Sequence, residues 1–446
     1  MSMRKILGRT GLVLAVLVAS VLVTRAVLNY LTGKKLEKFL VEAKSKGLPV
    51  SYADLGSACP APDNAGPLWE AAVALFDGQY RAKTNLNPAL AALFEARPLD
   101  EKTRTLIRAA IEKNRRSIDF LIEAAGRPCF REPNFPVFSF SDESFSRNYI
   151  STMQLIRLTG FEALFRAESG DGTGGLREWN QGFRFVRTMH EPVLIAALIE
   201  ISNARSLLAF LNRIVDGRAV DIDDLKTVLK ELDVETWRSG VAGSWKGERV
   251  FRIETVRDIL SGRLDAYESK IGSEIGRGKR FLLWLVRPWI RIQLMRQYTA
   301  FDQIERLFGE PYYQTRPRMN AYDDRHLHWY EWMPDGAITN ISSMGLKEAA
   351  LEALMETARI GIAARIYRAR EKHFPASIAD LVPGELPREP VDPFTGKPFV
   401  YRVDKDGLLV YSLGSNEKDN GGRGAYSIEQ LVTPKDDDWA WRDRIR

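Results

Sequence analysis

Residues 346–372 read LKEAALEALMETARIGIAARIYRAREK and lie where the sequence changes character. The stretch has no proline and a single glycine, and most of its residues are strong helix formers. After Lys372, six prolines between residues 375 and 398 separate short strand-like runs. We therefore expect a mainly α protein in which residues 346–446 form a small α+β module after a helical body.

Helical periodicity fills the sequence upstream of this stretch. Leu68, Trp69, Ala72, Leu75 and Phe76 follow the i, i+3, i+4, i+7 spacing of one buried helix face. Because helices joined by short loops pack as antiparallel neighbours, we expect a helical-hairpin array or irregular bundle. Irregular connections are expected over 127–145 and 309–320. Further helices are expected over 34–46, 87–94, 100–125, 148–169, 176–189, 192–216, 221–232, 235–262, 264–272 and 281–307.

Composition excludes several classes of protein. The 446 residues are 45% hydrophobic and 27% charged, which is ordinary for a globular chain. A mean hydropathy of −0.23, with one long apolar stretch, excludes a polytopic membrane protein. The formal net charge of +6 is small for this length, so it suits an anionic membrane surface but predicts no nucleic-acid partner.

The N-terminal residues predict where the protein lies in the cell. Residues 11–31 carry one charge, Arg25, and a helix of about 20 apolar residues crosses a bilayer. The basic residues at 4, 5 and 9 favour a cytoplasmic N-terminus, a single-pass inner-membrane anchor and a body in the periplasm. The alternative is a cleaved signal peptide with its apolar region at 12–23. The expected segments are 1–33 as anchor, 34–345 as helical extracytoplasmic domain and 346–446 as tail module.

Two cysteines, Cys59 and Cys129, are present. In an oxidising compartment they could form a disulfide, and otherwise they are two separate buried thiols. The sequence leaves both alternatives open.

The tail predicts a β-hairpin. Residues 399–403 and 408–413 are strand-like, and the Asp- and Gly-containing turn 404–407 joins them. Asp392 and Pro393, with the glycine and proline that follow, are expected to fix a turn that orients the hairpin. Residues 414–446 are rich in Gly, Asn and Asp, and the first of them, 414–422, are expected to form a loop that the insertion 423–434 lengthens.

The order of motifs in this tail resembles the globular part of the major pseudopilins of type II secretion. Those proteins have a helix, a YP step, a DPWGNPY segment, a strand ending YSLG and a Gly/Asp-rich calcium loop. Here the counterparts are the long helix, Phe374-Pro375, DPFTGKPFVYR from Asp392, YSLG from Tyr411 and the loop from Gly414. The same tail is similar to that of many bacterial envelope proteins with a helical body.

The resemblance implies a calcium site in this loop. Matched to the family, Asn416 and Asp419 would be side-chain ligands, and a carboxylate from Asp436, Asp437 or Asp438 would close the site. Calcium prefers six to eight oxygen ligands, which such a loop can offer. The alternative is a solvated acidic loop without metal, and the insertion 423–434 separates the closing carboxylate from the rest.

The chain also departs from the pseudopilins. No Glu follows five residues after a glycine at the start of the apolar segment, and more than 300 residues separate this segment from the tail. We therefore expect a pseudopilin-like head on a different body, not a filament subunit.

One basic and aromatic segment, 277–296, has two interpretations. Its Trp, Phe and Leu residues alternate with Arg and Lys, which is typical of a helix at a membrane surface. A core helix whose arginines reach outward along their stems has the same composition.

The sequence contains no convincing catalytic constellation. His190-Glu191 begins like a zinc-protease motif, but Leu194 replaces the second histidine, and no Gly-x-Ser-x-Gly segment exists. We therefore expect a membrane-anchored binding or scaffold protein of the bacterial envelope, associated with a secretion or pilus-like system. The alternatives are an envelope hydrolase with carboxylates in a cleft of the helical body, and a secreted calcium-stabilised protein.

Overall fold

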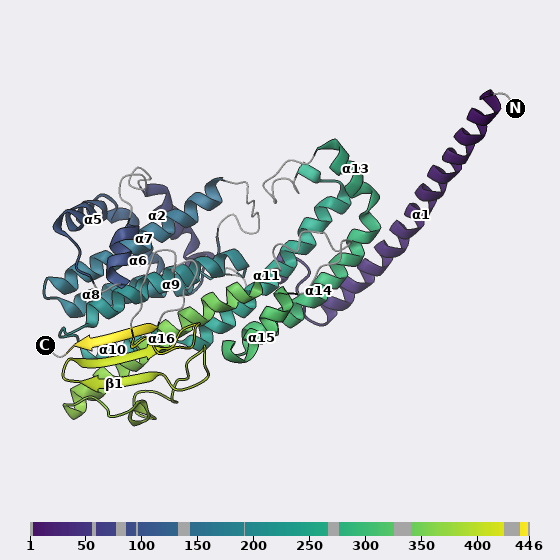
Figure 1. Ribbon diagram of the computed structural model, residues 1–446. Coiled ribbons are helices and arrows are strands. Elements are labelled where there is room, and N and C mark those ends of the chain that lie inside the picture. Colours follow the sequence, from purple (N-terminus) through teal and green to yellow (C-terminus); the bar gives the residue numbers. More distant parts are fainter. Residues whose placement is uncertain are drawn as a thin grey trace.

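A computed structural model gives the fold. It describes residues 3–55, 59–76, 86–94, 97–132, 143–190, 192–265, 276–324, 340–422 and 438–444. As predicted, the molecule is mostly helical, with a small antiparallel sheet near the C-terminus. Figure 1 shows three regions: a long N-terminal helix, a central body of helices, and a sheet beside the body.

The helices and strands follow the predicted periodicity closely. Aspartates cap several helices, as where Asp221 accepts hydrogen bonds from the first amides of α10. A left-handed glycine, Gly262, ends α11. The helices are α1 (Met3–Ser45), α2 (Gly66–Leu75), α4 (Asn87–Phe94), α5 (Glu101–Lys113), α6 (Arg115–Ala124), α7 (Glu143–Glu168), α8 (Gly172–Thr188), α9 (Leu194–Val215), α10 (Ile222–Glu231), α11 (Val234–Ser261), α13 (Arg277–Leu285), α14 (Arg287–Gly309), α15 (Tyr312–Asp323) and α16 (Ile341–Glu371). The strands are β1 (Val400–Asp404), β2 (Gly407–Ser412) and β3 (Trp439–Arg444).

Helix α16 is the centre of the molecule. Residues on all its sides are buried, from Ile341 to Ile366. Along its whole length, from Ile341 to Ile366, it packs in the main core, which is built from α2 to α10 with parts of α11, α14, α15 and β3. Its second half also packs in the tail core with Phe374, Leu386 and Val410. The expected boundary at 345/346 therefore falls inside one continuous helix that belongs to both cores.

Helix α1 exposes its apolar side chains from Leu12 to Leu31 and packs against the body further along. It has an apolar stretch long enough to cross a membrane, and that stretch is not buried in the structure. Further along, Leu36 and Ala43 pack against α11, α13 and α14 in a separate core, which we call the anchor-side core. A second helix of sufficient length and hydropathy, α9, is mostly buried and is a core helix. The expected boundary at 33/34 lies within α1.

The sheet has three strands in the order β1-β2-β3, all antiparallel. β1 and β2 form the predicted hairpin, with Val400 opposite Tyr411. The sequence predicted no strand after residue 413, but β3 returns and pairs Trp441 with Val410. Trp439, Trp441 and Asp443 alternate inward along β3. This strand covers the edge that a two-stranded hairpin would have left open.

Three other expectations need correction. The helix expected over 100–125 is broken at Asn114, which caps the end of α5 and the start of α6. The helix expected over 281–307 divides at Val286, because Pro288 lacks the amide that a continuous helix requires. The break expected over 309–320 contains α15, whose internal Pro317 misled the prediction.

The two cysteines form a disulfide. Cys59 and Cys129 are bonded with their Cα atoms 5.9 Å apart, across 70 residues of sequence. The bond ties the segment before α2 to the segment after α6, where the Ala65 amide also donates to the Cys129 carbonyl at 2.8 Å. The structure thus selects the paired alternative.

The contact between α16 and β3 leaves no room for a side chain at Gly361. A Cβ atom there would lie 2.1 Å from Trp441 Nε1. We expect Gly361→Ala to lower the free energy of unfolding by about 1–3 kcal/mol, as overpacked cores do. Denaturant unfolding followed by tryptophan fluorescence measures the change.

A matched control is Gly243→Ala in α11, where no atom lies within 4 Å of the added methyl group. This change should be neutral or stabilise the helix by up to about 1 kcal/mol. Equal losses in the two variants would contradict the packing argument.

Candidate functional site

Two of the predicted calcium ligands, Asp419 and Asp438, meet at a turn beside the sheet. Asp419 accepts hydrogen bonds from the Tyr411 hydroxyl and the Gly421 amide, both at 2.8 Å. Asp438 lies next to the same turn and accepts from the amides of Asn420 and Gly422, at 3.0 and 2.8 Å. The structure therefore brings Asp419 and Asp438 to one turn.

The other predicted ligands do not complete a cage. Asn416 Oδ1 accepts from the Lys418 amide at 2.7 Å, within its own turn. Asp436 and Asp437 lie outside the described residues. The calcium site therefore depends on a part of the chain that the structure does not describe.

The donors around Asp419 and Asp438 do not fit a cation. The Arg402 guanidinium lies 2.9 Å from Asp419 Oδ2, and Arg442 donates to the Gly422 carbonyl at 2.5 Å. The Tyr411 hydroxyl bond is the first cause that lowers the pKa of Asp419. A calcium ion at this turn would have to displace hydrogen-bond donors and approach positive groups. Calcium binding stays a prediction from the resemblance.

Asp392 has a structural role that the sequence predicted. Its carboxylate accepts from the Phe394 and Leu413 amides, both at 2.9 Å, and from the Ser412 hydroxyl at 3.0 Å. It therefore joins the turn before β1 to the end of β2. Burial raises the pKa of this carboxyl.

The buried carboxylates that a hydrolase would need lie along α16. Glu348, Glu352 and Glu356 are spaced by four residues and so share one helix face. Burial raises the pKa of all three, to about 7 for Glu356. Glu352 pairs with Arg238 at 2.5 Å, and Glu356 pairs with Arg359 at 2.8 Å.

These carboxylates have no room for a substrate. Glu348 and Glu352 line a cavity of about 10 Å³ together with Trp237 and Arg238. That volume is about the room of one water molecule, whereas ligand pockets measure roughly 300–1,000 Å³. The face is a buried ionic network, and it offers no site for the hydrolase alternative within the described part of the chain.

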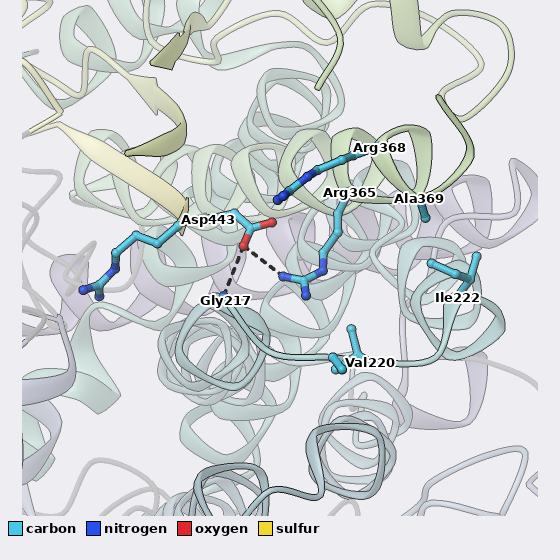
Figure 2. A pocket seen from close by; sticks show the side chains of 9 residues that line it. Gly217, Val220, Ile222, Arg365, Arg368, Ala369 and Asp443 are labelled. Atoms are coloured by element: carbon cyan, nitrogen blue, oxygen red, sulfur yellow. Dashed lines mark hydrogen bonds and ion pairs between the residues drawn. The ribbon is translucent and has the colours of Figure 1, made fainter. Parts of the chain in front are cut away.

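A pocket of ligand size opens where β3 ends. It has a volume of about 310 Å³ and is formed by the connection from α9 to α10, the last turns of α16 and the end of β3. Figure 2 shows the Arg365 side chain reaching from α16 toward Gly217, with the Arg368 side chain directed toward Asp443. We call this hollow the arginine pocket. Its lining residues are Gly217, Ala219, Val220, Ile222, Arg365, Arg368, Ala369, Asp443 and Arg444.

Two lining residues of the arginine pocket hold it together. Arg365 donates to Asp443 at 2.9 Å and to the Val215 carbonyl at 2.7 Å. Asp443 also accepts from the Gly217 amide at 3.2 Å. Burial raises the pKa of Asp443, and the neighbouring Arg365 opposes that shift. Because β3 was not predicted, Asp443 could not be placed opposite Arg365 from the sequence.

The lining of the arginine pocket carries more positive than negative charge. Three arginines and one aspartate line the hollow. Arg444 bonds to Asp216, outside the lining, at 2.8 Å. The Arg368 guanidinium lies 4.7 Å from the centre of the Phe374 ring, and Figure 2 shows its side chain beside Asp443. The pocket therefore suits a carboxylate or phosphate group.

Comparisons of the chain with models of protein families, with curated proteins and with solved structures find no match.

Glu356 makes stability depend on pH. Its pKa rises from 4.5 to about 7 on folding, so the folded state binds the proton more tightly than the unfolded chain does. The stabilisation is complete below pH 4.5 and is lost as pH rises through about 7. In the wild type, the free energy of unfolding should fall between about pH 5 and about pH 8. We expect Glu356→Gln to make this fall smaller by about 1–3 kcal/mol.

The readout is the slope of stability with pH, because the glutamine also changes the bond to Arg359. Glu371→Gln, at the exposed end of the same helix, is the control and should keep the wild-type slope. An unchanged slope in Glu356→Gln would show that the carboxyl does not take up a proton on folding.

Proposed function

We propose that the protein is a single-pass, membrane-anchored binding or scaffold protein whose body lies outside the cytoplasm. The observation that carries this proposal is α1: its apolar side chains from Leu12 to Leu31 are exposed, and its later turns are part of the anchor-side core. An exposed helix of this length and composition is stable in lipid, not in water. The same helix joins the body to the membrane without a linker.

Retention of the N-terminal segment is favoured over cleavage. The signal-peptide alternative places the cleavage site at residues 24–26, inside α1. Arg25 contacts the body there, because it donates to the Trp284 carbonyl at 2.8 Å and covers the Trp284 ring. Cleavage would remove this contact and the exposed half of the helix.

The disulfide supports a body outside the cytoplasm. Cys59 and Cys129 are bonded, and such bonds persist in oxidising compartments. With the basic flank of the apolar segment on the cytoplasmic side, the periplasm is the compartment we assign.

Binding is proposed for the arginine pocket. Its size is that of a small-ligand site and its lining is net positive, so we propose that it holds an acidic group of a ligand or partner protein. Association with a secretion or pilus-like system stays part of the proposal, and its support is the resemblance of the tail.

The pocket is tested with inorganic phosphate as a probe. We expect Arg368→Gln to weaken phosphate binding about tenfold or more in calorimetry, because a charged hydrogen bond is worth about 1.5–3 kcal/mol. Lys405→Gln, which removes one charge from the exposed hairpin turn, is the control and should bind as the wild type does. Equal binding by both variants, or none by the wild type, would refute the pocket.

Topology is tested with alkaline phosphatase fused after residue 444 and with thiol labelling. We expect active phosphatase, a full-length chain in the membrane fraction, and maleimide labelling only after reduction. Deletion of residues 11–31 should abolish phosphatase activity and leave both thiols reactive. A shortened, released chain would instead support signal cleavage, and a cytoplasmic wild-type chain would refute the proposal.

A further inference from the structure

The short helix α13 leaves apolar side chains uncovered at the end of the α11–α14 pair. Phe281 is 62% exposed and Leu282 is 44% exposed, whereas Leu283 packs in the anchor-side core. Basic residues Arg277 and Lys279, one turn earlier, are exposed too. Exposed aromatic and aliphatic side chains beside basic ones are typical of helices that lie in a membrane interface.

The position of α13 along α1 is fixed by direct contacts. Arg25 Cζ lies 3.4 Å from the centre of the Trp284 ring, and the Arg25 guanidinium donates to the Trp284 carbonyl. One turn further, Arg291 on α14 donates to Asn29 Oδ1 at 2.5 Å. In Figure 1, α13 lies at the end of α11 and α14 that faces the N-terminal half of α1. The uncovered side chains are therefore beside the last turns of the apolar stretch.

Three arginines gather at the same level without a carboxylate partner among the described residues. They are Arg25, Arg287 and Arg291, and Arg287 Nε is buried with no hydrogen-bond partner within that part of the chain. Burial lowers the pKa of Arg287, and the neighbouring Arg25 lowers it further. Burial and the neighbouring Arg287 and Arg25 also lower the pKa of Arg291. An anion between these groups would relieve their repulsion.

We propose that α13 lies in the headgroup region of the membrane that α1 enters. Phe281 and Leu282 insert among the acyl chains, and Arg25, Arg287 and Arg291 bind the phosphate of an anionic phospholipid. Trp284 then lies at the level where aromatic residues concentrate at membrane surfaces. Arg25 keeps its charge out of the hydrocarbon because its guanidinium lies on this ring and carbonyl. The inference rests on the proposed anchor and adds the depth at which the body is held.

The test uses the full chain in vesicles of phosphatidylethanolamine and phosphatidylglycerol, with an environment-sensitive NBD label on a single added cysteine. Leu282→Cys places the label on α13, and Leu106→Cys places it on α5 in the body. The two leucines are a matched pair, 44% and 45% exposed. The native cysteines are bonded to each other and leave the added thiol as the reactive one.

We expect the label at 282 to emit in the blue and to be quenched several-fold more strongly by doxyl lipids than the label at 106. Equal, weak quenching at both positions would overturn the insertion of α13. Flotation of the labelled chain with alkali-washed vesicles reports on the anchor separately. A chain that floats but is not quenched at 282 therefore refutes this inference and leaves the anchor in place.

The arginine cluster is tested by lipid composition. In vesicles of phosphatidylcholine alone, we expect quenching at 282 to fall by at least about half, since no anionic phosphate is enriched there. Arg287→Gln should remove the difference between the two vesicle types. A wild-type signal independent of composition would refute the anionic-lipid site, and a composition effect that persists in Arg287→Gln would refute the role of Arg287.

Discussion

The contact of Trp441 with Gly361 makes the helical body and the sheet one unit. Through it, a strand from the end of the chain rests on the helix that belongs to both cores. Helix α9 also holds β3, since Asn212 donates to the Arg442 carbonyl at 2.7 Å. A two-stranded hairpin is marginally stable alone, so the sheet depends on this third strand and on α16 beneath it.

Buried charges specify how the helices meet. Arg249 is fully buried between α11 and α14, where it pairs with Asp302 at 2.6 Å and lies 4.7 Å from the centre of the Tyr298 ring. Such pairs gain little over apolar packing, but losing one partner leaves a charge in a low-dielectric site. Alternative packings of so many amphipathic helices are therefore disfavoured.

The parts of the fold that depend on local patterns could be predicted from the sequence. Apolar periodicity gave most helices to within a few residues, and Asp392 was assigned to its turn from turn chemistry alone. β3 was missed because three consecutive aspartates precede it and its partner lies across a Gly-rich segment. The α15 helix was missed because Pro317 is usually a helix breaker.

The candidate binding site could not be predicted for a related reason. Arg365 and Arg368 looked like ordinary residues of a helix end, and Gly217 looked like a loop glycine. Only the return of β3 places Asp443 between them, more than 200 residues away in sequence from Gly217. Spacing along a helix carries no information about such a partner. In contrast, the loop at 414–422 was predicted from local composition, and its calcium site stays a prediction from the resemblance.

If the chain is exported as proposed, the disulfide sets an order in which its parts assemble. Both cysteines lie in the first third of the sequence, whereas β3 is at its end. During passage across a membrane from the N-terminus, the ring of 70 residues can close before the strand that completes the sheet has emerged. A single protease cut inside that ring also leaves the two fragments covalently joined. When the ring closes first, the disulfide links the first helices of the body before the rest of the chain has crossed the membrane.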